Sequence, residues 1–114
     1  AFGTFALCSN TTASENTAIG YLAMASNTIG NLNTALGGRA LMANTTGSCN
    51  VAIGGSALAA NTTGKCNVAV GKSALLNNTS GFGQVSIGAF AACSSTEGPY
   101  NIAIGQCALA TKTS

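Results

Sequence analysis

Large apolar, small and polar residues recur along this chain with a period of 17 residues. From Ala1, six full units and a partial seventh beginning at Ala103 cover residues 1–114 without an insertion or deletion. The third position of every unit is Gly, the sixth is Ala and the eleventh is Thr. A fixed period of this kind indicates units that stack on their neighbours and bury together a face that none could bury alone. The pattern therefore predicts one repeat array with no separate domains.

Positions 16, 17, 1, 2 and 3 of the unit predict one short strand, as in the segment 50–54, which reads Asn-Val-Ala-Ile-Gly. The larger side chains of positions 17 and 2 point to one face of this strand, and the small residues of positions 1 and 3 point to the other. We expect both faces to be buried. We also expect chains to associate through the small-residue face, because small residues allow another backbone to approach closely.

Three columns of equivalent residues should form structural ladders along the array. These are the glycines Gly3, Gly20, Gly37, Gly54, Gly71, Gly88 and Gly105, the aliphatic residues Ile19, Ile53, Val70, Ile87 and Ile104, and the carboxamides Asn16, Asn33, Asn50, Asn67 and Asn101.

Adjacent apolar columns at positions 7 and 8 predict a second strand over positions 5 to 9. A single helical turn is the alternative, because Ala, Leu and Met favour helix, although an isolated turn has little stability of its own. Asn-Thr-Thr-Gly at residues 44–47 and 61–64 predicts a corner, in which Asn bonds to nearby backbone and Gly supplies a positive φ.

These elements predict an all-β fold, a parallel β-solenoid of flattened 17-residue coils. Paired strands rise about 4.8 Å per coil, so seven coils would form a rod roughly 30 Å long. A roll this thin buries little surface for its length, and we therefore expect association with other copies of the chain.

The charge composition argues against several kinds of partner. Four basic and two acidic residues give a net charge of +2, which provides no basic stripe for nucleic acid or an anionic membrane. No apolar run approaches the roughly 20 residues that span a bilayer. All six charged residues lie outside the apolar columns and should mark the solvent-facing side; they are Glu15, Arg39, Lys65, Lys72, Glu97 and Lys112.

Five cysteines are the only reactive set in the sequence. Cys49 and Cys66 share position 15 in successive units, which would bring their Cα atoms within the range of about 4.4–6.8 Å that a disulfide needs. We expect Cys8, Cys93 and Cys107 to be small buried hydrophobes rather than interchain bridges. With no His and no CxxC motif, the sequence predicts neither a metal nor another cofactor.

The chain offers no recognisable catalytic set, because it has no His and its two carboxylates lie nearly five coils apart. We therefore predict that it is not an enzyme. Candidate N-glycosylation sequences begin at Asn10, Asn44, Asn61 and Asn78. The threonine column raises an alternative function, because regularly spaced threonines on a solenoid face can order water, as in ice-binding proteins.

The unit N-[TV]-A-[IV]-G-x-x-A-L-x-x-N-T-T-G-x-x, carried with small variations by residues 33–49, 50–66 and 67–83, resembles the head repeats of trimeric autotransporter adhesins. It is more similar still to the variant of those repeats in phage and viral tail-fibre proteins. This resemblance implies a left-handed parallel β-roll, a homotrimer about a common axis, and attachment to a receptor or glycan from a cell or virion surface. The expected function is thus an extracellular structural or adhesive fibre segment, with a tail-fibre shaft or an ice-binding solenoid as alternatives. Because the columns continue along the whole array, we also expect end-to-end stacking into a filament.

Overall fold

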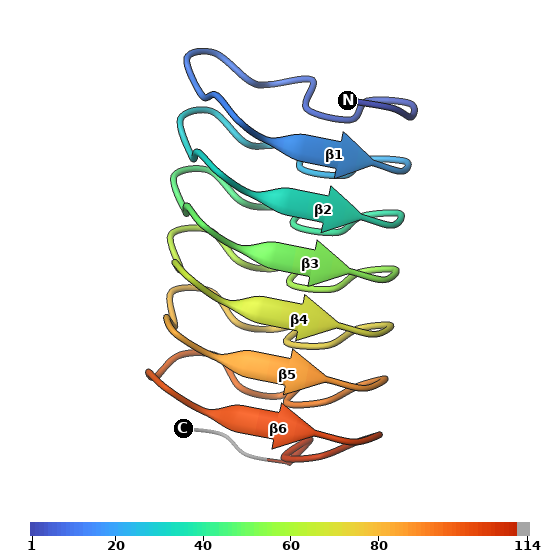
Figure 1. Cartoon of the computed structure of the whole chain (residues 1–114), viewed down its shortest axis with the longest axis vertical. Coiled ribbons are helices and arrows are strands. Elements are labelled where there is room, and N and C mark those ends of the chain that lie inside the picture. The colour runs from blue at the N-terminus through green and yellow to red at the C-terminus, as the bar shows by residue number, and fades with distance from the viewer. Residues whose placement is uncertain (112–114) are drawn as a thin grey trace.

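The computed structural model describes residues 1–111, which form a parallel β-solenoid with a 17-residue period (Figure 1). Each coil after the first contributes one strand of three residues to a six-stranded sheet in chain order. Every neighbouring pair is parallel and offset by one period, so that Ala52, for example, lies between Ala35 and Ala69. A bridge from Phe2 to Ile19 extends the pairing into the first coil. The strands are β1 (Thr17–Ile19), β2 (Thr34–Leu36), β3 (Val51–Ile53), β4 (Val68–Val70), β5 (Val85–Ile87) and β6 (Ile102–Ile104).

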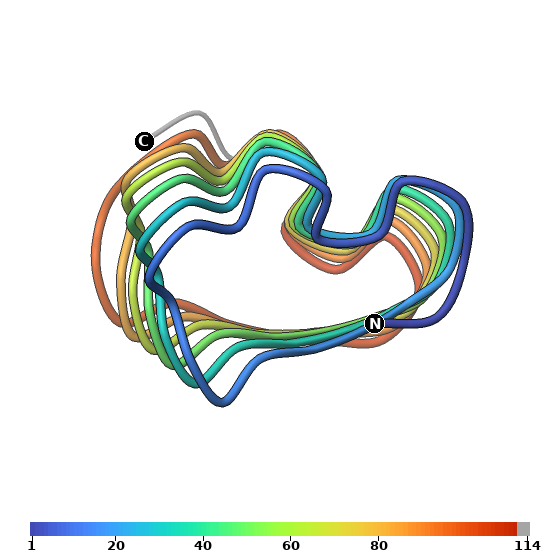
Figure 2. The same ribbon diagram turned by 90° about the horizontal axis from the view of Figure 1, so that it is seen from above.

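The chain winds as a left-handed coil. In Figure 1 the strands run from left to right across the near side while the chain descends, and Figure 2 shows the return path behind them. Viewed along the axis, successive coils lie nearly on top of one another. The molecule measures 35 × 21 × 16 Å, and its long dimension agrees with the rod length expected from the strand spacing.

The strand faces are oriented differently from the expectation. The small residues of position 1 point into the coil and are buried, including Ala35, Ala52 and Ala69 at 0% exposure. The larger residues of positions 17 and 2 point outward and are partly or largely exposed. The prediction that chains associate through the small-residue face is therefore wrong, because these small residues lie inside the narrow coil and pack beside the buried Leu and Met side chains.

Positions 3 to 10 form neither the predicted second strand nor the alternative helical turn. They form three linked β-turns, in which the N–H of positions 6, 8 and 10 donates to the carbonyl three residues earlier. The intervening N–H groups of positions 7 and 9 donate to the next coil, as Leu58 does to the carbonyl of Ala74 at 3.0 Å. In one coil the turn bonds join Ala57 to Gly54 at 3.2 Å, Ala59 to Ser56 at 3.3 Å, and Asn61 to Leu58 at 3.1 Å.

The backbone of these turns is left-handed at positions 5 and 7. Ser56 has φ 60° and Leu58 has φ 52°, a conformation that costs a residue other than Gly roughly 1 kcal/mol. Leu58 is nonetheless fully buried. The core consists of this column and the alanines of positions 1 and 6, while position 8 points outward. The largest core side chains are Met24, Leu41, Leu58 and Leu75.

Gly54 shows why position 3 requires glycine. Its φ is +125°, and a Cβ built there would lie 2.7 Å from the carbonyl atoms of Gly71 on the next coil. A Cβ built on the neighbouring Gly55 would meet no atom within 4 Å, since position 4 faces solvent.

Gly54→Ala should therefore lower the free energy of unfolding by about 3 kcal/mol, through left-handed strain and the clash with the next coil. Gly55→Ala is the matched control and should change it by less than about 0.5 kcal/mol. Urea denaturation followed by circular dichroism measures both. Equal effects of the two substitutions would contradict the close stacking of position 3.

Candidate functional site

Buried asparagines of position 16 join each coil to the next. Asn50 is fully buried. Its Oδ1 accepts a hydrogen bond from the backbone N–H of Asn67 at 3.0 Å, and its Nδ2 donates to the carbonyl of Gly64 at 2.8 Å. Both partners lie on the following coil. The carboxamide is thus satisfied only when the coils keep their 17-residue register, which matters because a buried polar group without a partner costs about 1–3 kcal/mol.

A second asparagine ladder runs beside the first at position 10. Asn61 is also fully buried, and its Nδ2 donates to Oδ1 of Asn44 at 2.8 Å and to the carbonyl of Gly64 at 3.1 Å. The carbonyl of Gly64 therefore accepts hydrogen bonds from both ladders. A Cβ on Gly64 would lie 2.5 Å from the carbonyl oxygen of Gly81. This corner glycine is required by close approach, and the expected positive φ at this position is wrong.

The threonine column is held by the same stacking. Thr45 donates from its N–H at 3.0 Å and from its Oγ1 at 3.2 Å to the carbonyl of Thr62 on the next coil. The hydroxyl proton is thus used within the solenoid. This arrangement favours a structural role for the column over an ordered-water surface.

Three of the four candidate glycosylation asparagines are buried in the position-10 ladder. Asn44, Asn61 and Asn78 are completely buried, and the Nδ2 atom that would carry a glycan is hydrogen-bonded in each. Glycan attachment at these three residues is incompatible with the fold. Asn10 is exposed, and its Nδ2 donates to the carbonyl of Ala13 at 3.1 Å.

The cysteines lie nearer the surface than expected. Cys49 and Cys66 are exposed free thiols that occupy the same column on neighbouring coils, so their disulfide remains a prediction. The expected burial of the other three is wrong: Cys8 and Cys107 are exposed and Cys93 is partly exposed. Cys8 and Cys93 stand at the outward-pointing position 8, which an apolar sequence pattern alone does not distinguish from the core position beside it.

The charged residues occupy the solvent-facing side, as expected, for the part of the chain that the structure describes. Glu15, Arg39, Lys65, Lys72 and Glu97 are all exposed, whereas Lys112 and Thr113 lie outside the described residues. Within residues 1–111, no three His, Cys, Asp or Glu side chains gather as metal ligands would. Over the same residues, no helix has the length and apolar character needed to cross a membrane.

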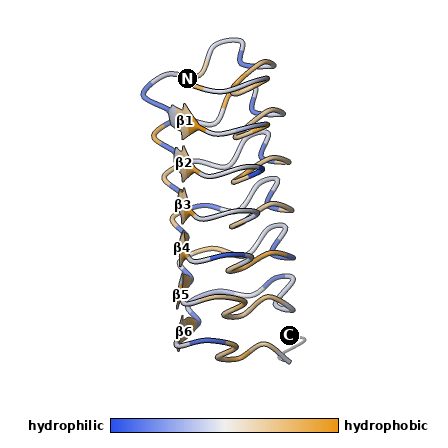
Figure 3. Ribbon diagram, turned by 90° about the vertical axis from the view of Figure 1, so that its right-hand side faces the viewer, coloured by the Kyte–Doolittle hydropathy of each residue, from blue (hydrophilic) through white to orange (hydrophobic). Residues whose placement is uncertain are grey.

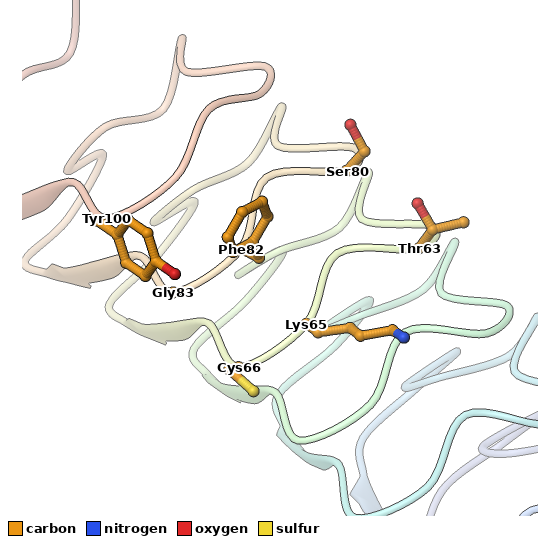
Figure 4. Close-up of a pocket in the computed structure, with 7 residues that line it drawn as sticks. All are labelled: Thr63, Lys65, Cys66, Ser80, Phe82, Gly83 and Tyr100. Carbon is orange, nitrogen blue, oxygen red and sulfur yellow. The ribbon is translucent and has the colours of Figure 1, made fainter.

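Two surfaces stand out as candidate sites. The first is the outward face of the sheet, defined by positions 17 and 2 of β1–β6; Figure 3 shows these strands in one vertical row along one side of the molecule. The second is an open groove of about 550 Å³ at the corner that precedes the strands (Figure 4). Its lining residues are Thr63, Lys65, Cys66, Ser80, Phe82, Gly83 and Tyr100.

Comparison with known protein families, with curated proteins and with solved structures finds no match to this chain.

Within residues 1–111 the ladders depart from their pattern at one place, where Gln84 replaces Asn at position 16 and Ser95 replaces Asn at position 10 of the next coil. In the regular coils, Oδ1 of a position-10 Asn accepts from the equivalent Asn below it. Ser95 cannot supply that amide. The longer side chain of Gln84 does so instead, donating to Oδ1 of Asn78 at 2.7 Å and to the carbonyl of Gly98 at 3.0 Å. The two replacements therefore compensate for each other.

Gln84→Asn should destabilise the fold by about 1–2 kcal/mol, because Oδ1 of buried Asn78 loses its donor. Ser95→Asn should also destabilise it, since the new carboxamide competes with Gln84 for the same space. The double variant restores two regular ladders. Its loss of unfolding free energy should be smaller than the sum of the losses in the two single variants by at least about 1 kcal/mol. A double-mutant cycle in urea measures this coupling, and strict additivity would rule out the compensation.

Proposed function

We propose that this chain is a segment of an extracellular fibre, in which copies associate side by side through the outward face of the sheet and the fibre serves attachment at a cell or virion surface. The observation that carries the proposal is the composition and exposure of that face. Every residue on it is aliphatic or Thr: Thr17, Ile19, Thr34, Leu36, Val51, Ile53, Val68, Val70, Val85, Ile87, Ile102 and Ile104.

This face has the character of a protein interface. Ile53 near the middle is 37% exposed, and Ile102 and Ile104 are 68% and 67% exposed. A row of exposed and partly exposed aliphatic side chains along one face is typical of an interaction site. In Figure 1 the viewer looks directly onto this face, where the three-residue strands form one column along the 35 Å length of the molecule.

The remaining features fit a role in stiffness and display. Parallel strands in one register give the rod a continuous hydrogen-bonded side, and the asparagine ladders tie the corner before each strand to the neighbouring coil. The variable positions 4, 5, 14 and 15 point outward and carry most of the charged residues. Association of three copies about one axis rests on the resemblance of the 17-residue unit to adhesin-head and tail-fibre repeats, as does the extracellular setting.

Charges placed on the sheet face should separate the copies. Val51→Lys combined with Val68→Lys should give monomers, because two buried ammonium groups without partners would oppose association. Ser48→Lys combined with Gly55→Lys is the matched control, since Lys65 and Lys72 already occupy these positions one coil later. The control should keep the oligomer.

Analytical ultracentrifugation measures the mass of each species, with circular dichroism to confirm folding. A monomeric wild-type chain, or equal dissociation of both double variants, would contradict the proposal.

A further inference from the structure

The groove lies at the outer corner of the solenoid, where the residues differ most from those at the same positions of the other coils. Phe82 stands at position 14, where the four preceding coils carry Ser, Asn, Ser and Lys. Gly83 follows at position 15 with a left-handed φ of 65° and no side chain. Tyr100, from position 15 of the next coil, lies over Gly83: a Cβ built on Gly83 would be 2.8 Å from Cδ1 of Tyr100. Figure 4 shows the Tyr100 ring beside Phe82 above this glycine.

The two rings pack against each other on the surface. Their centroids are 5.4 Å apart and their planes meet at 83°, an edge-to-face arrangement typical of stable aromatic pairs. Both rings nevertheless remain accessible, because Tyr100 is 73% exposed and Phe82 is 46% exposed. The absence of a side chain on Gly83 makes room for the Tyr100 ring, and a ligand can reach the exposed surfaces of both rings.

The polar groups of the groove are few and lie at its rim. Thr63 and Ser80 contribute hydroxyl groups from position 12 of successive coils, and Lys65 is the only charged residue in the lining. Glu97 occupies position 12 one coil beyond Ser80. Lys65 lies at one end of the groove and Glu97 lies beyond the other end. The charge along this corner therefore changes from positive to negative along the fibre axis.

We propose that this groove binds an acidic polysaccharide, with one sugar ring against Tyr100 and Phe82 and a sugar carboxylate directed toward Lys65. The apolar C–H face of a pyranose matches an exposed aromatic ring, and its hydroxyl groups can exchange hydrogen bonds with Thr63 and Ser80. A site that is mainly apolar, with a few polar groups to fix orientation, is typical of small-ligand binding, and its volume lies within the usual range of about 300–1,000 Å³.

The charge distribution selects the acidic ligand and its orientation. Lys65 attracts a carboxylate, whereas Glu97 disfavours one at the opposite end. This inference rests on the proposed attachment function, because the groove is then the contact through which the fibre holds a polysaccharide-coated surface.

The test screens the wild-type chain on an array of acidic and neutral polysaccharides, and then titrates the best acidic oligosaccharide by calorimetry. Tyr100→Ala and Phe82→Ser should each weaken binding about tenfold or more; the second substitution places at position 14 a residue that other coils already carry. Lys65→Ser should weaken binding of acidic saccharides and leave that of neutral ones unchanged. Tyr21→Ala removes an exposed ring elsewhere on the surface and is the control.

Absence of binding across the array, or an equal loss with Tyr21→Ala, would overturn the inference. Dissociation of the oligomer by Phe82→Ser or Tyr100→Ala would also overturn it, since the rings would then belong to a contact between chains. Ultracentrifugation of the same samples separates the two proposals: a monomer that still binds acidic saccharide would contradict the fibre and retain the groove.

Discussion

The structure depends on the hydrogen bonds that buried carboxamides make from one coil to the next. The interior is too narrow for a conventional core, and its largest side chains form a single column of Leu and Met. A carboxamide buried in such an interior has no contact with solvent. Asn50 therefore depends for its hydrogen bonds on the N–H and carbonyl groups of the following coil. Asn67 lies 17 residues and Gly64 lies 14 residues after Asn50, so both are in reach only when successive coils keep the 17-residue register. The period in the sequence is therefore a requirement of hydrogen bonding.

The same narrowness explains which side chains the surface presents. Alanines of positions 1 and 6 fill the interior, so the larger residues of the strands have no place inside and remain on the surface. The left-handed turns of positions 3 to 10 allow every second N–H to bond between coils, at the cost of strained backbone at residues such as Leu58. A repeat of this kind gains stability chiefly from its neighbours along the chain, and its outward sheet face is the surface through which we propose that copies associate.

The period, the strand positions and the ladder columns could be read from the sequence, because each is a statement about which residues are equivalent. Alternation did not reveal which strand face points inward, since that depends on the width of the coil. Propensity was misleading at positions 5 to 9, where stacking holds Leu58 in a left-handed conformation that its side chain disfavours. Phe82 and Gly83 are visible as exceptions to their columns, but the groove required the position of Tyr100 over Gly83.

Exchange of side-chain amide protons tests the central claim most directly. The Nδ2 protons of Asn50, Asn61 and Asn67 are buried and hydrogen-bonded, whereas Asn31 is exposed at the outer corner. Nuclear magnetic resonance should find the three ladder carboxamides exchanging at least about a hundredfold more slowly than Asn31, because exchange requires opening of neighbouring coils. Exchange of all four at the same rate would show that the ladders do not hold the coils together.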